Sequence, residues 1–412
     1  MPSLLSLNNY GYIRGGSDAV FLSHDRLFAE NGWDTAIMAM RHPKNFPSKW
    51  SSYFVDEIEM GRDYSLMQKA KMSAKIIYSM EARRKLSALL DVFTPDVAHV
   101  HNIYHHISPS VLSLLKERGV PMVLTAHDLK LACPNYKMLN RTGVCERCRG
   151  GNYLNVIRHR CLHGSVALST LVALESTLHR ALRSYSGNLN KIVAPSAFMR
   201  NKLMEWGWAG SMIEVIPNFV AYESMQPKFE PGGHFVYFGR LQMDKGLDTL
   251  VQAAADAKVA LQVVGTGPDE RAVAQLAEQA GADVVFHGYQ SGGALHALVR
   301  EARAVVIPSR LYENAPIAAL EAYALGKPVI GSRIGGIPEL VREGETGALF
   351  DTGDVAALSA TLRHYQELPD DRLAAMGRAG RDMVERGFSE NVYVERMADL
   401  YARVGVRAAI PA

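Results

Sequence analysis

The sequence predicts an α/β protein built from two doubly wound, Rossmann-like domains. Short apolar runs rich in β-branched residues alternate with helical patterns from end to end, which is typical of parallel sheets covered on both faces. The chain has 412 residues, enough for about two domains of ordinary size. A stretch rich in turn-forming residues, 218–235, lies between two series of such runs and is the expected domain boundary.

Each series contains six candidate strands. In the first half they are Ser3–Asn8, Asp34–Met40, Val97–Asn102, Val120–His127, Lys191–Ser196 and Glu214–Pro217. In the second half they are Phe235–Gly239, Ala260–Gly265, Val284–Gly288, Ala304–Ser309, Pro328–Ser332 and Gly347–Phe350. A last helical pattern, Ser389–Val404, has no strand after it. We therefore expect domains at 1–220 and 231–385, followed by a C-terminal helical segment at 386–412.

The composition is that of an ordinary globular protein, with 48% hydrophobic and 21% charged residues. The net charge of +3 is too weak to indicate a nucleic-acid partner, and none is expected. No apolar run reaches the roughly 18–20 residues of a membrane span. The first residues lack the charged start and apolar core of a signal peptide, so a cytoplasmic location is expected.

Ligands of open parallel sheets bind beyond the carboxyl ends of the strands, so the residues that follow each strand are the first candidates. After the first strand, Gly15 and Gly16 begin a helix, where backbone can approach an anion closely; a simple tight turn is the alternative. His127 and Asp128 end another strand as a polar pair. His101 is a weaker candidate of the same kind, and a structural role is the alternative for each histidine.

In the second half, Arg240 and Lys245 follow the first strand as two cations beside a turn, a pattern that suits a diphosphate but also a solvated loop. Gly265 follows the next strand, in a loop that permits close backbone approach. A dinucleotide fingerprint would need a third glycine where Glu270 stands, which argues against a nicotinamide dehydrogenase.

The stretch YENAPIAALEAYALGKPVIGS, Tyr312–Ser332, contains two glutamates separated by seven residues, Glu313 and Glu321. Pro316 suits the first turn of a helix, because its missing N–H costs nothing there. Free N–H groups at the helix start can then face a phosphate or a sugar hydroxyl. These groups belong to Asn314, Ala315 and Ile317. Glu313 can accept hydrogen bonds from sugar hydroxyls outside the helix, and Glu321 can hold a ribose from within it.

These motifs resemble the retaining glycosyltransferases of family 4, which have the GT-B fold of two Rossmann-like domains facing a central cleft. The segment ENAPIAALEAYALGKPVIGSRIGGIPELV carries the most specific likeness, through its glutamate pair. FGRLQMDKG, VVGTGP, IVAPSAF and VIPN match in order, as do the N-terminal double glycine and AHD. The resemblance covers nearly the whole chain and is greatest to bacterial enzymes of cell-surface polysaccharide synthesis. It implies that the C-terminal helix at 386–412 crosses back to the N-terminal domain.

The resemblance implies a role for each motif. The N-terminal domain would carry the acceptor, a glycan or polyprenyl-linked glycan. Gly15 and Gly16 would lie near the donor diphosphate, and His127 would face the transferred sugar and the phosphate. Arg240 and Lys245 would neutralise the leaving group, so that catalysis needs no metal or other cofactor.

Of the two glutamates, the resemblance implies that Glu313 binds the donor sugar and Glu321 the nucleotide ribose, with backbone amides near 314–317 assisting. The donor would be a UDP-sugar or GDP-mannose. A sugar-nucleotide epimerase on the same fold is the alternative enzyme. A zinc-bearing nucleic-acid-binding protein is the alternative from another class.

All four cysteines, Cys133, Cys145, Cys148 and Cys161, fall in one insert at 130–163 that is rich in Gly, Arg and Asn. Four thiolates with one close pair suit a structural zinc ion. Disulfides and unpaired thiols are the alternatives, and a reducing cytoplasm favours zinc over disulfides.

The segment 62–85 contains seven Lys or Arg against Asp63 and Glu81, a net charge of +5. Its apolar residues recur at near-helical spacing, so it predicts either a basic helix lying on an anionic membrane surface or a solvated helix packed on the sheet. The resemblance favours the membrane, because related enzymes use lipid-linked acceptors. The protein would then be peripheral on the inner face of the membrane.

Overall fold

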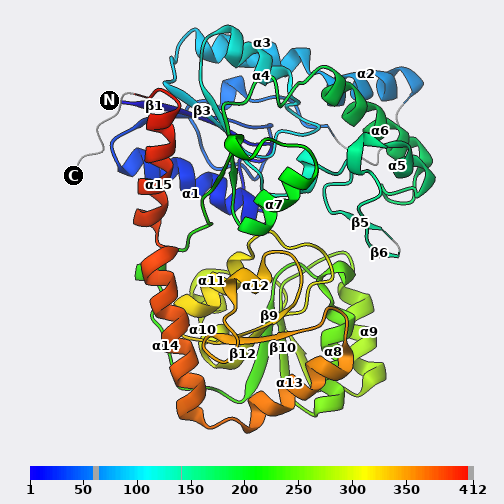
Figure 1. Cartoon of the computed structure of the whole chain (residues 1–412), viewed down its shortest axis with the longest axis vertical. Helices are drawn as coiled ribbons and strands as arrows, with labels where there is room; N and C mark the ends of the chain where they lie inside the picture. The colour runs from blue at the N-terminus through cyan, green and yellow to red at the C-terminus, as the bar shows by residue number, and fades with distance from the viewer. Residues whose placement is uncertain (59–64, 141, 407–412) are drawn as a thin grey trace. The chain divides into compact units, whose positions relative to one another are not determined.

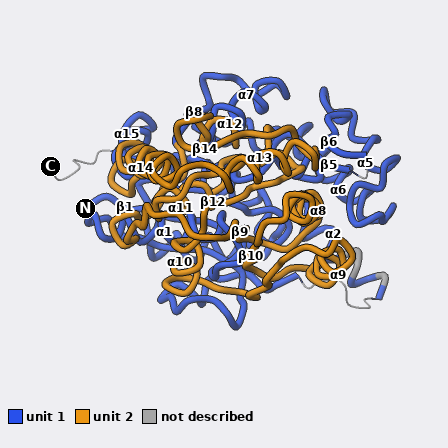
Figure 2. The backbone as a smooth tube through the Cα atoms, turned by 90° about the horizontal axis from the view of Figure 1, so that it is seen from below, with its two compact units in different colours: residues 1–216, 394–412 blue, residues 217–393 orange. Residues whose placement is uncertain are grey.

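The structure, a computed structural model of the whole chain, describes residues 1–58, 65–140 and 142–406 (Figure 1). It divides into two compact units (Figure 2). Unit 1 contains residues 1–216 together with 394–412, and unit 2 contains residues 217–393. Unit 1 is therefore formed by both ends of the sequence, whereas unit 2 is continuous.

Unit 1 is built on a six-stranded parallel sheet with the strand order β2-β1-β3-β4-β7-β8. The strands are β1 (Ser3–Leu7), β2 (Asp34–Met38), β3 (Val97–Val100), β4 (Met122–Thr125), β7 (Lys191–Ala194) and β8 (Ile213–Val215). The helices of this unit are α1 (Gly16–Glu30), α2 (Leu66–Ile77), α3 (Met80–Leu90), α4 (Ser110–Glu117), α5 (Leu154–Arg158), α6 (Val166–Ala181), α7 (Ala197–Glu205) and most of α15 (Glu390–Arg403). Each strand expected in the first half overlaps an observed strand.

Unit 2 is built on a second six-stranded parallel sheet with the order β11-β10-β9-β12-β13-β14. Its strands are β9 (His234–Phe238), β10 (Leu261–Val264), β11 (Val284–Phe286), β12 (Ala302–Ile307), β13 (Val329–Ser332) and β14 (Gly347–Phe350). Its helices are α8 (Leu247–Ala257), α9 (Glu270–Ala280), α10 (Gly292–Arg300), α11 (Ile317–Ala324), α12 (Ile337–Leu340), α13 (Val355–Glu367) and α14 (Asp370–Gly387). All six strands expected here are confirmed.

The sheet of unit 2 is covered on both faces, as its uninterrupted apolar strands predict. Alternate residues of β9 point to opposite faces: Phe235 and Tyr237 join a core with α8 and α13, whereas Val236 and Phe238 join a core with α11 and α14. The two doubly wound domains predicted from the sequence are therefore confirmed.

Two features of unit 1 go beyond the sequence prediction. The cysteine-bearing insert contains a short antiparallel hairpin, β5 (Leu139–Asn140) and β6 (Gly143–Val144). The basic segment forms two helices, α2 and α3, because Ser79 begins a new helix by accepting a hydrogen bond from the N–H of Ala82. Within the described residues, no helix is long and apolar enough to cross a membrane.

Candidate active site

In unit 2, the predicted Lys245 and Glu313 lie in direct contact. Lys245 ends a short 3₁₀ turn, Met243–Lys245, after β9, and Glu313 lies in the loop between β12 and α11. Because β9 and β12 are neighbouring parallel strands, their carboxyl ends bring the two loops together. The Nζ of Lys245 donates to Oε1 of Glu313 at 2.6 Å. The Oγ of Ser309 donates to the same oxygen at 2.5 Å.

Gly246 makes this approach possible. Its φ of +73° lies in the left-handed region, and a Cβ at this position would lie 1.9 Å from the carbonyl oxygen of Pro308. The neighbouring backbone is joined by a hydrogen bond from the N–H of Arg310 to the carbonyl of Asp244, at 2.9 Å. The turn that carries Lys245 is thus held against the end of β12.

The backbone of Glu313 is held by two further glycines. Gly335 has φ +61°, and a Cβ there would lie 2.2 Å from the carbonyl oxygen of Glu313. Gly336 donates its N–H to the same oxygen at 2.7 Å. The glycines of the RIGGIP motif therefore set the position from which the Glu313 carboxylate reaches Lys245.

Arg240 differs from Lys245 in its surroundings. Its side chain is exposed, and it makes no ion pair within the part of the chain that the structure describes. Its carbonyl accepts a hydrogen bond from the hydroxyl of Tyr237 at 2.8 Å. The structure thus brings one of the two predicted cations to Glu313 and leaves the other directed to solvent.

The helix predicted after Glu313 is α11, and it begins one residue later than Pro316 suggested. Pro316 is the N-cap rather than a first-turn residue, because its ψ of 117° is extended. Its carbonyl accepts the N–H of Ala319 at 3.1 Å. The N–H groups of Ile317 and Ala318 make no hydrogen bond among the described residues. Asn218, from the VIPN motif, supports this loop by donating to the carbonyl of Ala315 at 3.0 Å.

Glu321 lies one turn inside α11 and is partly buried. No hydrogen-bond donor among the described residues reaches its carboxylate. Burial alone raises the pKa of this carboxyl group from 4.5 to about 7. A ligand that donates hydrogen bonds to Glu321 would replace the solvation that the carboxylate has lost.

The glycines of VVGTGP serve the protein's own packing. Gly265 has φ +133°, and a Cβ there would lie 1.9 Å from the carbonyl of Gly239. A Cβ at Gly267 would lie 2.1 Å from the carbonyl of Leu241. This loop therefore supports the segment that carries Arg240, and a direct contact between Gly265 and a donor stays a prediction.

In unit 1, Gly15 and Gly16 occupy the start of α1, as predicted. Gly15 is the N-cap, and both residues are exposed. The φ of Gly15 is −175°, which any residue can adopt, and a Cβ there would meet no atom within 4 Å. Neither backbone strain nor packing explains this glycine, whereas close approach of a ligand would.

His127 and Asp128 follow β4 and are both partly buried. Burial lowers the pKa of His127 to about 4 and raises that of Asp128 to about 6. The Nε2 of His127 lies 2.8 Å from Nδ1 of His101, which follows β3. The two strand-end histidines that the sequence indicated, His101 and His127, therefore contact each other.

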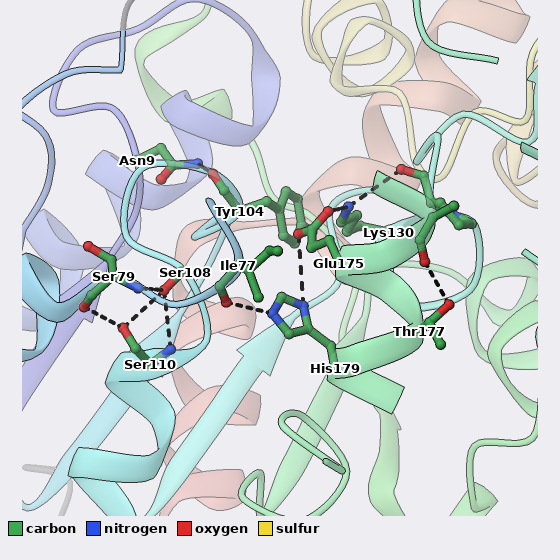
Figure 3. A network of polar contacts seen from close by, with 12 residues as sticks. Asn9, Ile77, Ser79, Tyr104, Ser108, Ser110, Lys130, Glu175, Thr177 and His179 are labelled. Carbon is green, nitrogen blue, oxygen red and sulfur yellow. Dashed lines mark hydrogen bonds and ion pairs between the residues drawn. The ribbon is translucent and has the colours of Figure 1, made fainter. Parts of the chain in front are cut away.

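A buried polar network, which sequence analysis did not find, holds the loop after β4 (Figure 3). Tyr104 donates its hydroxyl to Asp128 at 3.1 Å. Lys130 pairs with Glu175 of α6 at 2.8 Å, with side chains 4% and 0% exposed. His179 of α6 in turn contacts the carbonyl of Ile77 at the end of α2, at 2.8 Å. No local motif marks Glu175, because it lies on a helix far along the sequence.

The four cysteines are all free thiols, and Cys133 and Cys148 are buried. Burial raises the pKa of Cys133 to about 11 and that of Cys148 to about 12, and nearby cysteines add to both shifts. Among the described residues, no group of three or more His, Cys, Asp or Glu is arranged to hold a metal ion.

Structural zinc stays a prediction. We expect elemental analysis of the untagged protein to give about one zinc per chain. Four freely titrating thiols in a protein without metal would exclude the zinc site.

In the basic segment 62–85, Arg62 and Asp63 lie outside the described residues. Much of the remaining positive charge is paired within the protein. Lys75 contacts Glu81 at 2.7 Å, Arg83 contacts Glu117, and Lys85 donates to the carbonyl of Ser52 at 2.7 Å. Lys71 and Arg84 are exposed. The cationic surface is therefore smaller than the sequence count suggests.

Comparison with known families gives two matches that together span most of the chain. Residues 14–224 match the profile described as Glycosyltransferase Family 4. Residues 223–383 match the profile described as Glycosyl transferases group 1.

Curated relatives show moderate identity. A protein of Escherichia coli K12, whose name assigns it to colanic acid biosynthesis as a glycosyltransferase, is 32% identical over 173 residues, or 39% of this chain. That match spans 43% of the relative, less than half of its length. A glycogen synthase of Mycobacterium tuberculosis is 28% identical over 325 residues, which are 74% of this chain and 68% of that protein.

Solved structures match the fold over almost the whole chain. A sucrose-phosphate synthase from Thermosynechococcus elongatus has a TM-score of 0.73 at 19% identity, covering 98% of this chain and 99% of that one. Anabaena HepE in complex with UDP and glucose has a TM-score of 0.69 at 16% identity, covering 98% and 100%. At these identities the likeness concerns the fold alone.

Proposed function

Because the chain belongs to glycosyltransferase family 4, we propose that it transfers a sugar from a nucleotide-sugar donor to a glycan or lipid-linked glycan in cell-surface polysaccharide synthesis, with retention of the anomeric configuration. The observation that carries the proposal is the contact of Lys245 and Ser309 with Glu313 just before α11. On that helix lies Glu321, whose carboxylate has no hydrogen-bond partner among the described residues. A cation, free backbone N–H groups and two carboxylates suit the diphosphate, sugar and ribose of such a donor.

In the structure, Glu313 holds the ammonium of Lys245 in place. When a donor binds, its diphosphate would compete for this cation, and the Glu313 carboxylate would accept hydrogen bonds from the sugar instead. The exposed Arg240 guanidinium is available as a second cation for the phosphates. With two cations offsetting the leaving group, we expect turnover to continue in EDTA; a loss that Mg²⁺ restores would contradict this.

The transfer step would proceed on one face of the sugar. The bond between the anomeric carbon and the phosphate oxygen breaks, and a bond to the acceptor oxygen forms on the same side. The acceptor proton passes to the departing phosphate oxygen. Glu313 would stabilise the positive charge that grows at the anomeric carbon, and such differential stabilisation is what raises kcat.

The proposal is tested by donor screening followed by product analysis. A thermal-shift panel of UDP-sugars and GDP-mannose identifies the donor, because a ligand that binds the native state raises its Tm. The HepE complex with UDP makes UDP-sugars the first choice.

NMR of the fresh product should show the donor's α configuration retained. A β-linked product from an α-donor would overturn the retaining mechanism. Interconversion of the donor sugar without transfer would favour the epimerase alternative, which the family match does not support.

Glu321→Gln should change two separate quantities, the stability of the folded protein and its affinity for the nucleotide. The folded pKa of about 7 lies above the ordinary 4.5, so the folded state binds the proton more tightly than the unfolded state. Wild-type stability therefore falls as pH rises from about 4.5 to 7. At pH 8 the variant should be more stable than wild type by on the order of 3 kcal/mol, and the difference should vanish below pH 4.5.

The same variant should bind the nucleotide more weakly, with little change in kcat, because the ribose contact is similar in the ground and transition states. Calorimetric titration of UDP or GDP measures the affinity, and thermal unfolding at two pH values measures the stability. Unchanged nucleotide affinity in a variant with the expected stability gain would remove Glu321 from the donor site.

The membrane contact is the second part of the partner proposal. It is supported by the exposed Lys71 and Arg84 together with Met67 and Met80, whose exposed fractions are 71% and 68%. Binding to vesicles with anionic lipid should weaken steeply as salt increases. Equal binding to neutral vesicles would exclude the electrostatic explanation.

A further inference from the structure

Unit 1 contains a stack of histidines that the proposed reaction uses only at one end. His99 and His101 are fully buried, and their ring centroids lie 4.6 Å apart with planes inclined by 28°. His101 is followed by the partly exposed His127, with centroids 5.1 Å apart and planes inclined by 16°. His24 of α1 lies beside His99, at 4.4 Å between centroids. His127 is thus the outermost ring of a stack that reaches into the unit.

The His101–His127 contact joins two neutral rings. Besides His127, the rings that pack against His101 belong to Phe21, His24 and His99, and none of these rings carries a negative charge. Burial holds the pKa of His101 well below its usual range. The pair is therefore uncharged near neutral pH, and the 2.8 Å hydrogen bond between Nδ1 of His101 and Nε2 of His127 contains a single proton.

Two tautomeric arrangements satisfy that hydrogen bond, and the other nitrogen of His101 distinguishes them. Nε2 of His101 is buried and has no hydrogen-bond partner among the described residues. If Nδ1 of His101 carries the proton, Nε2 of His101 is unprotonated and has only a lone pair, which needs no acceptor. If Nε2 of His127 carries it, Nε2 of His101 becomes a buried N–H without an acceptor. Orphaned N–H groups are rarer in protein interiors than under-satisfied acceptors, so the first arrangement is favoured.

We propose that His101 is a positioning residue that donates its Nδ1–H to Nε2 of His127 and thereby keeps the proton of His127 on Nδ1. Nδ1 of His127 makes no hydrogen bond among the described residues, so it is available to a ligand. The inference rests on the proposed function for one point, the group that this N–H meets: an oxygen of the donor sugar or phosphate. His127 would orient that oxygen by donating a hydrogen bond from an uncharged ring. Lys245 and Arg240 would still balance the negative charge of the diphosphate.

His99 provides a matched control. It is as buried as His101 and stacks on it, but its own nitrogens contact Thr125 Oγ1 at 2.7 Å and the hydroxyl of Tyr401 at 2.5 Å. No hydrogen bond joins it to His127. Replacing His99 therefore disturbs the same core without removing the donor to His127.

The tautomer is tested first, in the donor-free protein and without any activity measurement. NMR of protein with ¹⁵N-labelled histidine reports which ring nitrogens carry protons, and the His127→Gln variant assigns the His127 signals. We expect protonated Nδ1 and unprotonated Nε2 in His127. The opposite pattern, or a charged His127 at neutral pH, would overturn the proposal even if the enzyme is a glycosyltransferase.

Turnover is tested next with paired variants. His101→Leu should lower kcat by at least about tenfold, whereas His99→Leu should lower Tm by a similar amount and leave kcat near wild type. His101→Asn, whose amide nitrogen lies near the position of Nδ1, should recover part of the loss. Equal kcat in His101→Leu and His99→Leu would assign His101 a purely structural role. If His101→Leu does not fold, the Asn variant and the NMR result still decide. If wild type transfers no sugar, the proposed function fails while the tautomer result stands.

Discussion

Glu313→Gln is expected to lower kcat by about 100-fold or more while the affinity for the free nucleotide changes little. In the structure, Oε1 of Glu313 accepts hydrogen bonds from Lys245 and Ser309. A glutamine oxygen can still accept both, so the geometry is largely retained while the charge is lost. Because the charge acts on the developing positive centre, the loss should appear in kcat rather than in nucleotide binding.

Single-turnover kinetics and nucleotide titration measure the two effects separately. The matched control is Glu345→Gln, which removes a carboxylate from the exposed ion pair with Arg342 and should change neither quantity. If Glu313→Gln and Glu321→Gln showed the same kinetic defect, the separate roles proposed for the two glutamates would be wrong, although the fold would remain correct.

Gly335→Ala is expected to reduce turnover about as much as Glu313→Gln, and to destabilise unit 2 by roughly 2–4 kcal/mol. An added Cβ would lie 2.2 Å from the Glu313 carbonyl oxygen and 2.7 Å from its nitrogen, so the backbone must move. That movement displaces the carboxylate from Lys245. Turnover at a temperature where the variant is fully folded gives the catalytic loss, and chemical unfolding gives the loss of stability.

Gly344→Ala is a control that introduces backbone strain without the steric clash expected in Gly335→Ala. Gly344 also has a left-handed φ, +75°, but a Cβ there would meet nothing within 4 Å. This variant should lose about 1 kcal/mol of stability and keep its kcat. Normal turnover in Gly335→Ala would show that the position of Glu313 does not depend on this glycine.

The sequence predicted the strands well because buried parallel strands are uninterrupted apolar runs, a local signal. The rule that ligands bind at carboxyl ends of strands also directed attention to His127, Lys245 and Glu313. Their partners were harder to predict. The Lys245–Glu313 contact depends on β9 lying beside β12. The apolar pattern of a strand does not predict which other strand it will lie beside.

Other contacts depend on side chains far apart in the sequence. Tyr401 contacts His99 across 302 positions, and Lys130 meets Glu175 across 45. No periodicity or motif joins such pairs, since each results from the packing of a helix against the sheet or its loops. The one-residue error at Pro316 has a different cause: proline is compatible with both the N-cap and the first turn, and only the observed ψ distinguishes them.

The division of unit 1 between the two ends of the sequence has a consequence for synthesis on the ribosome. Tyr401 of α15 lies in the core of unit 1, with its hydroxyl between His24 and His99. Residues 1–216 are made first, yet this core stays incomplete until the final helix emerges, roughly 10–40 s later at ordinary elongation rates. Unit 2 is continuous and can fold in that interval. We therefore expect stalled nascent chains that have emerged from the ribosome as far as residue 393 to protect unit 2 from protease and to leave unit 1 sensitive. Equal protection of both units would show that unit 1 folds without α15.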